Sequence, residues 1–458
     1  MSADQLLAKL RSTLGEKAVV TDPDVLDANR NDEATFCAAG VPLVLVRPGT
    51  TAEVQEVVRA AGEYGVPIVT QGARSGLSGG ANAIDGCILL STARMNRVLE
   101  ISVEDQVAVV QPGVVNADLS RAVLGQGLFY PPDPSSWEMS TVGGNIATNA
   151  GGLCCVKYGV TGDFVRGLEV VLASGEVVRT GRRSVKGVAG YDLTQLIVGS
   201  EGTLGIVTEA TLALRPAPEA ALTAAATFLS VEEGVAAAAA VMASGLRPSL
   251  LEFLDGPTAR AIQNYRDMGL PENVGSLLMA QSDRGPRAAE DVAAIAEICT
   301  AHGAAEVAVA SDAEESAMLL EARRLVHYAL EPLGTTLIDD VAVPRSKLVA
   351  LLTGITEIGT KYDVLICCPG HIGDGNMHPT VVFDRSDPAA EARALEAFGA
   401  VMELGLALGG TITGEHGIGK LKRQWLAQEL GPVGLRLQRD VKAAFDPQSL
   451  LNPDKLFL

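Results

Sequence analysis

Three glycine-rich segments stand close together in the N-terminal half and restrict what this part of the chain can form. They lie at residues 71–80, 143–152 and 199–205. Glycine is needed where the backbone takes positive φ or approaches a phosphate or a planar ring closely. The first segment follows an expected strand and carries Arg74 and two serines, which suits a pyrophosphate. Because ordinary turns rarely supply three such segments so near one another, they indicate a cofactor bound by the N-terminal half.

A β-α-β unit leads into the first glycine segment. We expect a strand at residues 42–47, a helix over residues 52–64 and a second strand at residues 66–70. Thr50 and Glu53 have the spacing of a capping box at the start of the helix. The glycine segment lacks the Gly-x-Gly-x-x-Gly pattern that opens a helix in Rossmann domains, so a Rossmann fold is not expected.

The C-terminal half holds all five histidines, and three of them fall in two segments framed by glycines. His371 and His378 are not spaced as a helical i, i+4 pair, so a tight loop must fold their imidazoles together. Glu415 and His416 are neighbours farther along the chain. Two histidines and a carboxylate form a common three-ligand metal set that leaves positions open for substrate. We predict a metal on His371, His378 and Glu415; zinc and manganese both fit, and cobalt or iron stays open. The alternative is that these histidines bond backbone carbonyls in a packed core.

The formal net charge of −19 opposes binding to nucleic acid or to anionic membranes. An anionic substrate would therefore need cations close to its site. With 458 residues, 47% hydrophobic and 20% charged, the chain is expected to fold into more than one domain. It has no apolar run of about 20 residues and no evident signal peptide. Seven cysteines without metal-finger spacing favour reduced thiols in a cytoplasmic protein.

These motifs together resemble a known family of flavoproteins. Residues 47–50, 72–80, 143–152 and 199–205 are similar to the FAD domain of the vanillyl-alcohol-oxidase type. Within that type the chain resembles the FAD-linked D-2-hydroxy-acid dehydrogenases, a group that includes D-lactate dehydrogenases, the FAD subunit of glycolate oxidase and D-2-hydroxyglutarate dehydrogenases. The resemblance covers nearly the whole chain and extends to both histidine segments and to the Asn452-Pro453 ending.

The resemblance implies an α+β fold in three parts. A two-subdomain FAD-binding domain would cover residues 1–218, and an α+β substrate cap domain with the metal site would cover residues 219–425. A C-terminal segment, residues 426–458, would return to the FAD domain. Pro216 and Pro218, followed by an alanine-rich stretch, mark the first boundary.

The resemblance also implies FAD bound without a covalent link, since the FAD domain has no histidine that could attach it. A thioether to Cys154 or Cys155 is a disfavoured alternative. The pyrophosphate would lie on residues 71–80, and residues 143–152 would line the ring systems. The residues expected to contact FAD are Gly72, Ala73, Arg74, Ser75, Gly76, Leu77, Gly79, Gly80, Pro132, Thr141, Gly143, Gly144, Asn145, Thr148, Asn149, Gly151, Gly152, Glu201, Gly205, Ile206, Val207 and Asn452.

The implied reaction is oxidation of a D-2-hydroxy acid to the 2-keto acid, with hydride transfer to flavin N5 and the metal on the substrate hydroxyl. His416 is the predicted general base. For the substrate carboxylate, register with the family favours Arg324 and leaves Arg323 as the second choice, against the alternative of an exposed helix arginine. Tyr328, one turn on, can share the pocket, and Asn376 either holds the loop or touches substrate.

Residues 338–340 narrow the choice of substrate. Members that act on 2-hydroxyglutarate resemble Lys-Tyr-Asp here, where the lysine holds the distal carboxylate, whereas this chain reads Ile-Asp-Asp. An aspartate would repel a second carboxylate, so D-lactate is favoured, glycolate oxidation within a larger complex is second and D-2-hydroxyglutarate third. From other classes, a flavin-free metallohydrolase and a non-catalytic flavin-binding relay protein stay as alternatives.

The partner of this reaction is a small anionic 2-hydroxy acid. The electron acceptor is open among a cytochrome, a quinone, an electron-transfer flavoprotein and oxygen. No nucleic acid is expected, a homodimer is compatible with the family, and the expected location is cytoplasmic, with a peripheral membrane position for a quinone acceptor.

Overall fold

The structure is a computed structural model that describes residues 3–457, and its chain divides into two compact units. Unit 1 comprises the described residues up to Gly151, Val160–Ala217 and the chain from Glu415 onward, whereas unit 2 comprises Gly152–Gly159 and Pro218–Gly414. The chain enters unit 2 at Pro218, next to the boundary expected from the prolines. It re-enters unit 1 at Glu415, earlier than the expected residue 426, and the excursion of residues 152–159 into unit 2 has no counterpart in the sequence-based expectation.

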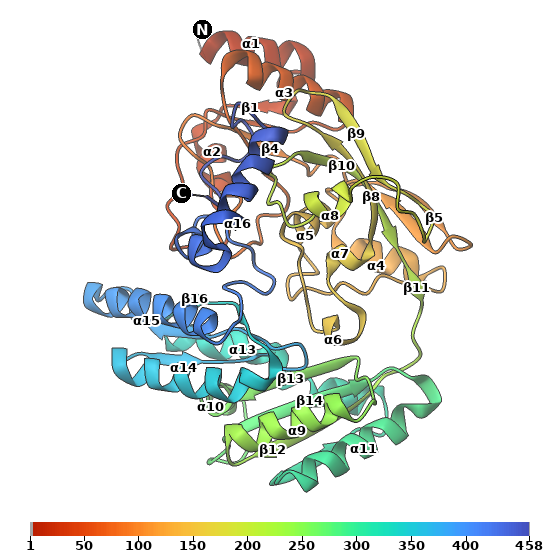
Figure 1. The fold of residues 1–458 in the computed structure, drawn as a ribbon, viewed down its shortest axis with the longest axis vertical. Helices are drawn as coiled ribbons and strands as arrows, with labels where there is room; N and C mark the ends of the chain where they lie inside the picture. The colour runs from red at the N-terminus through yellow and green to blue at the C-terminus, as the bar shows by residue number, and fades with distance from the viewer. Residues whose placement is uncertain (1–2, 458) are drawn as a thin grey trace. The chain divides into compact units, whose positions relative to one another are not determined.

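Unit 1 contains a four-stranded sheet in the order β1-β2-β4-β3, in which β2 and β3 run parallel to β4. Its strands and the three helices beside it (Figure 1) are β1 (Val19–Val20), β2 (Val44–Val46), β3 (Ile68–Gln71), β4 (Ile88–Ser91), α1 (Ala3–Leu14), α2 (Pro23–Asn29) and α3 (Thr51–Tyr64). The hydroxyl of Thr50 accepts the Glu53 N–H, and α3 ends at Gly65 in the left-handed conformation. The β-α-β unit expected from the sequence is therefore present.

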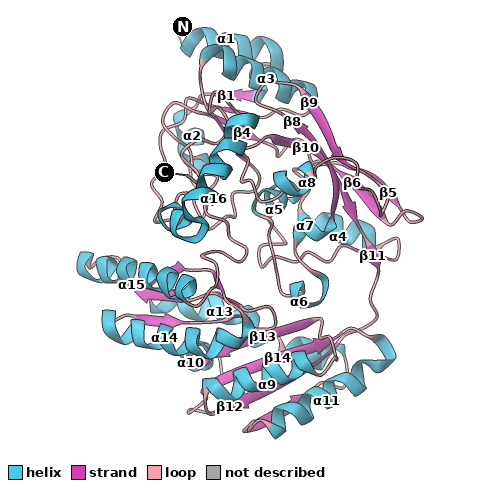
Figure 2. Cartoon of the chain, in the orientation of Figure 1, coloured by secondary structure: helices cyan, strands magenta, loops and turns pink. Residues whose placement is uncertain are grey.

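A five-stranded antiparallel sheet forms the other half of unit 1, in the order β5-β6-β10-β8-β9 (Figure 2). Its strands are β5 (Val98–Ser102), β6 (Val107–Val110), β8 (Val165–Val171), β9 (Val177–Gly181) and β10 (Ile206–Ala213). The helices and the small strand pair of this half are α4 (Asn116–Leu124), α5 (Val142–Thr148), α7 (Thr161–Phe164), α8 (Leu193–Ile197), β7 (Leu128–Phe129) and β11 (Arg215–Pro216). Strands β8 and β9 form a hairpin whose turn contains Gly175, which has φ 78°.

The C-terminal segment is built into the core of unit 1. Helix α16 (Arg423–Phe445) is interrupted at Gly431, which has positive φ and precedes Pro432. Beyond the helix, Leu451 forms a parallel bridge with Ile68 and is fully buried in the same cluster as Ile206. The return of the chain therefore contributes to the packing of both sheets.

Unit 2 is built on a seven-stranded sheet, β15-β12-β14-β13-β19-β20-β17, and a three-stranded sheet, β16-β21-β18. The strands are β12 (Leu222–Phe228), β13 (Leu250–Asp255), β14 (Ser276–Ser282), β15 (Glu306–Val309), β16 (Thr335–Ile338), β17 (Val341–Ala342), β18 (Leu365–Cys367), β19 (Gly370–His371), β20 (Asn376–Met377) and β21 (Thr380–Phe383). The helices are α6 (Cys155–Tyr158), α9 (Val231–Ala243), α10 (Gly256–Tyr265), α11 (Ala288–Ala301), α12 (Ala313–Leu319), α13 (Glu321–Leu330), α14 (Leu348–Tyr362) and α15 (Pro388–Ala407). None of the described helices could cross a membrane.

Three contacts within unit 2 fix helix α13 and the segment that contains α6. Helices α10 and α13 pack with β13 and β14 in one apolar cluster, which fixes the rotation of α13. The excursion that contains α6 is held by Asp283, whose carboxylate accepts hydrogen bonds from the Lys157 amine and the Tyr158 hydroxyl. A Cβ added at Gly373 would meet Val156 of α6, so this excursion also packs on the loop between β19 and β20.

Candidate functional site

The structure brings the first two glycine segments together in unit 1. A Cβ on Gly72 would lie 2.4 Å from Thr141 Oγ1, and one on Gly143 would lie 2.5 Å from Pro112 Cβ. The Thr141 hydroxyl accepts the Gly144 N–H at 3.3 Å and caps α5, a short helix that overlaps the second glycine segment and is not expected from the sequence. Gly72 is thus required by the close approach of the first segment to the second, and Gly143 by the close approach of Pro112.

Backbone strain gathers in the segments predicted to hold FAD. Arg74, Asn149, Glu201 and Asn452 are non-glycine residues with φ between 43° and 63°. Such conformations persist where surrounding contacts enforce them, and they gather at ligand sites. The Arg74 guanidinium donates to the Ala28 carbonyl at 2.7 Å. This side chain, which is predicted to bind the pyrophosphate, is therefore hydrogen-bonded within unit 1.

Asn452 connects the chain end to two glycine segments. Its amide donates to the Gly80 carbonyl at 3.0 Å and to the Glu201 carbonyl at 2.7 Å. The resemblance marks Asn452 as an FAD contact, and in the structure its amide nitrogen binds backbone. Asn149 behaves similarly, since its side-chain oxygen accepts the Gly162 N–H at 2.8 Å. Both residues shape the loops.

Glu201 is a buried carboxylate that holds the returning chain. It accepts the N–H groups of Ile418 at 2.7 Å and of Gly419 at 2.9 Å. Burial raises the pKa of Glu201 to about 7, although these two hydrogen bonds act in the opposite direction. The side chain predicted to contact FAD is therefore engaged with residues 418–419.

The described residues of unit 1 fit a bound cofactor. The amide nitrogen of Asn145 is buried and has no hydrogen-bond partner among them, in the segment where Thr141 and the glycines meet. An unpaired buried donor is costly, so a ligand acceptor at this place would remove the penalty. Ile206, which is also expected to contact FAD, is buried in the core cluster of unit 1.

In unit 2, a hairpin places two buried histidines side by side. His371 lies in β19 and pairs with Asn376 of β20, and His378 follows directly. Their ring centroids are 5.0 Å apart with the planes at 84°. Gly375 at the turn has φ 87°. This is the tight loop expected from the glycines, and it brings two imidazoles within reach of one ion.

A fully buried carboxylate, Glu252 of β13, lies behind His371. One of its oxygens is 2.6 Å from His371 Nδ1, and the other accepts a hydrogen bond from Arg323 Nε at 2.6 Å. Burial alone would raise the pKa of Glu252, but the charges of His371 and Arg323 outweigh it and hold the pKa below its ordinary value. No motif in the sequence indicates Glu252.

A second carboxylate stands beside the other histidine. Asp340 Oδ1 is 3.8 Å from His378 Nδ1, and Asp340 Oδ2 accepts the Thr413 hydroxyl at 2.7 Å. Its neighbour Asp339 is also fully buried. Asn376, whose role the sequence leaves undecided, packs its amide against Gly414, where a Cβ would clash. Asn376 therefore supports the loop.

The two candidate arginines occupy different faces of α13. Arg323 is 15% exposed and points to Glu252, as described, whereas Arg324 is exposed. Tyr328 is also mostly exposed. Register with the family favours Arg324, but the structure places Arg323, the second choice, beside the histidines. Ala322 and Val326 face the core and leave Arg324 on the solvent side.

Glu415 and His416 open the last part of unit 1. A Cβ on Gly151 would lie 2.3 Å from Glu415 Oε2, so Glu415 packs on the second glycine segment. His416 Nε2 is 3.8 Å from Glu415 Oε1. The grouping of Glu415 with His371 and His378 stays a prediction.

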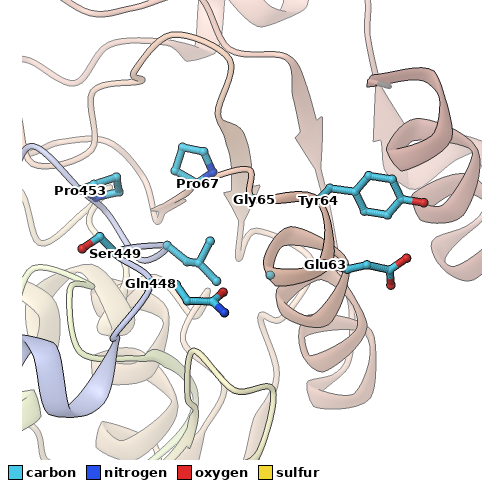
Figure 3. A pocket seen from close by; sticks show the side chains of 9 residues that line it. Glu63, Tyr64, Gly65, Pro67, Gln448, Ser449 and Pro453 are labelled. Atoms are coloured by element: carbon cyan, nitrogen blue, oxygen red, sulfur yellow. The ribbon is translucent and has the colours of Figure 1, made fainter. Parts of the chain in front are cut away.

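A surface hollow elsewhere in unit 1 does not carry the chemistry. It is open to solvent, between the end of α3 and the chain end, and is lined by residues that include Glu63, Tyr64, Gln448 and Ser449 (Figure 3). It contains neither a histidine nor any of the residues expected to bind FAD, metal or substrate.

Two protein families match successive parts of the chain. The FAD binding domain family matches residues 42–181, and the C-terminal domain family of FAD linked oxidases matches residues 217–456. The second match alone covers more than half of the chain.

Individual relatives match over nearly their whole length. The chain is 44% identical to the glycolate oxidase protein GlcD of Bacillus subtilis over 93% of this chain and 91% of the relative. It is 37% identical to GlcD of Escherichia coli K12, over 90% and 83% of the two chains. It is 35% identical to D-lactate dehydrogenase of Anaerostipes hadrus, over 99% and 97%.

Solved structures confirm the expected fold class. p-Cresol methylhydroxylase with bound substrate aligns with a TM-score of 0.80 at 20% identity, covering 99% of this chain and 96% of that one. 4-Ethylphenol oxidase from Gulosibacter chungangensis aligns with a TM-score of 0.77 at 21% identity, covering 99% and 97%. The α+β fold is therefore of the vanillyl-alcohol-oxidase type.

Proposed function

We propose that this chain oxidises D-lactate with the help of a divalent metal. The premise is that the chain belongs to the FAD-linked oxidases of the D-lactate dehydrogenase and glycolate oxidase group. It is an FAD-linked oxidoreductase, and oxidation of a 2-hydroxy acid is the activity that the names of its relatives support. Metal dependence and the choice of acid are the proposal. A flavin-free hydrolase does not agree with membership of this family.

The observation that carries the metal proposal is the buried histidine pair with its flanking carboxylates. Metal-binding histidines commonly place the second ring nitrogen against a carboxylate, as His371 does with Glu252. Glu415 is the proposed third ligand. Zinc and manganese suit two imidazoles and a carboxylate. When bound, the metal lowers the pKa of the substrate hydroxyl and FAD accepts hydride.

The remaining roles belong to Arg323 and His416. The terminal nitrogens of Arg323 would bind the substrate carboxylate, since Nε is already held by Glu252. His416 would accept the hydroxyl proton, because it adjoins Glu415 and an imidazole can exchange a proton near neutral pH.

The acidic surroundings favour a monocarboxylic substrate. Asp339 and Asp340 are both fully buried next to the histidine hairpin, and the position of the lysine found in 2-hydroxyglutarate enzymes is held by Ile338. A second substrate carboxylate would therefore meet negative charge without an added cation. Glycolate is the second candidate, and its support is the 44% identity to a glycolate oxidase protein, against 35% to a D-lactate dehydrogenase.

The test is an anaerobic visible spectrum of the purified protein, with D-lactate, L-lactate, glycolate and D-2-hydroxyglutarate added in turn. The proposal predicts loss of the oxidised flavin band at about 450 nm with D-lactate and none with L-lactate. Bleaching by glycolate alone would transfer the assignment to the second candidate. Bleaching by D-2-hydroxyglutarate alone, or by none of the four acids, would overturn the proposed substrate.

A further inference from the structure

Glu252 is a buried carboxylate that is neither a proposed metal ligand nor a proposed substrate-binding group. It lies in β13, whose next residue, Phe253, pairs with Gly370 of β19. Its carboxylate is fully buried, and each of its two oxygens is used by a different partner, His371 and Arg323. A buried carboxylate is tolerated only when its charge is compensated, so the three side chains stabilise one another.

The two contacts have complementary consequences. A hydrogen bond at His371 Nδ1 fixes the orientation and the tautomer of the ring, so that Nε2 is the nitrogen offered to a metal. The bond at Arg323 Nε holds the guanidinium plane while its terminal nitrogens stay available for a planar carboxylate. One carboxylate therefore orients the proposed ligand and the proposed substrate-binding cation together.

We propose that Glu252 is a positioning residue that couples metal binding at His371 to substrate binding at Arg323. It touches neither the metal nor the substrate. The proposal rests on the proposed function, since it assumes that His371 binds a metal and that Arg323 binds the acid.

The test uses Glu252→Gln, which keeps the shape of the side chain and removes its charge. Asp255→Asn is the matched control, because Asp255 lies in the same strand, is also buried, and caps α10 through Thr258 without contacting the histidines. Mn²⁺ affinity of the metal-free protein is measured by electron paramagnetic resonance of the free ion. E252Q is predicted to weaken Mn²⁺ binding about 10- to 100-fold, whereas D255N lowers the melting temperature and leaves Mn²⁺ affinity within about twofold.

A double-mutant cycle then distinguishes the loss of an oriented Arg323 side chain from general damage to the fold. E252Q is predicted to raise KM at least about fivefold when Arg323 is present. In the Arg323→Ala background it should raise KM little further, while the loss of Mn²⁺ affinity persists. An equal KM effect in both backgrounds would overturn the coupling, and so would wild-type Mn²⁺ affinity in E252Q.

Two further cases need their own tests: a variant that does not fold, and a wild-type protein that lacks the proposed activity. If E252Q does not fold, Glu252→Asp keeps the charge on a shorter side chain and is predicted to raise both constants by a smaller factor; wild-type values for both would overturn the proposal. If wild-type protein binds no Mn²⁺ and oxidises no 2-hydroxy acid, the proposed function itself fails. If wild type does both and E252Q does both equally well, only the role of Glu252 fails.

Discussion

The two units of this chain build their candidate sites by different means. Unit 1 relies on backbone shape: of the ten non-glycine residues with positive φ in the described chain, eight lie in unit 1, and glycines stand where segments approach closely. Unit 2 relies on buried ionisable side chains: two histidines from the β19–β20 hairpin, with the carboxylates of Glu252 and Asp340 beside them. A large planar cofactor with phosphates needs a surface of backbone, whereas a small ion and a small acid need a few oriented side chains.

The largest expected effect comes from the histidine hairpin. His378→Ala should remove the metal and lower kcat at least about a thousandfold, because the acid would lose its proposed cation. FAD should stay bound, since the residues expected to hold it lie almost entirely in unit 1. Metal content, flavin absorbance and turnover check this prediction.

His302→Ala is the control for the hairpin variant, since His302 lies in unit 2 and bonds the Ile298 carbonyl at the end of α11. It should keep both cofactors. Loss of FAD together with the metal in H378A would mean that the two sites are not separate.

The next effect distinguishes the arginines of α13. Arg323→Ala should raise KM for the acid about 10- to 100-fold, because a charge-assisted hydrogen bond is worth roughly 1.5–3 kcal/mol. Arg324→Ala should stay within about twofold of wild type, since its side chain is exposed. Steady-state kinetics decide, and the reverse order would restore Arg324 to the site.

A smaller effect is expected in unit 1. Asn452→Ala removes hydrogen bonds to the Gly80 and Glu201 carbonyls, each worth about 0.5–1.5 kcal/mol. FAD retention during dilution should fall about tenfold, while Mn²⁺ affinity should not change. If Asn452→Ala weakens Mn²⁺ binding as much as FAD binding, the contrast between backbone-built and side-chain-built sites is wrong.

The last effect concerns folding stability and not binding, and it is a pH dependence caused by Glu201. Its pKa rises from 4.5 to about 7 on folding, so the folded state holds the proton more tightly. The resulting stability is present below pH 4.5 and is lost as the pH rises through about 7, with a slope of at most about 1.4 kcal/mol per pH unit.

Glu201→Gln cannot titrate and should lack this component of the slope. Urea unfolding of both proteins between pH 5 and 8 measures it. Parallel pH profiles would show that Glu201 does not titrate in this range.

Local sequence patterns predict part of the fold and part of the candidate site. Capping at Thr50, the glycine segments and the tight loop between His371 and His378 depend on near neighbours, which the sequence displays directly. Contacts between distant residues are not visible in this way. Glu252 and His371 are 119 positions apart, and Glu252 has no motif around it.

Two further features of the structure depend on distant contacts. Register with the family favours Arg324, whereas the rotation of α13, which depends on packing against α10, turns Arg323 toward Glu252. The crossing of residues 152–159 into unit 2 depends on Asp283, more than a hundred positions away. Tertiary partners decide both features.

Removal of the metal alone tests most directly whether different residues hold the metal and FAD. Purified protein is treated with a chelator, its metal content and the flavin band at about 450 nm are measured, and D-lactate is added without oxygen. The account predicts that the band persists, that bleaching by D-lactate is lost, and that added Zn²⁺ or Mn²⁺ restores it. Bleaching at the wild-type rate in protein shown to be free of metal would contradict it.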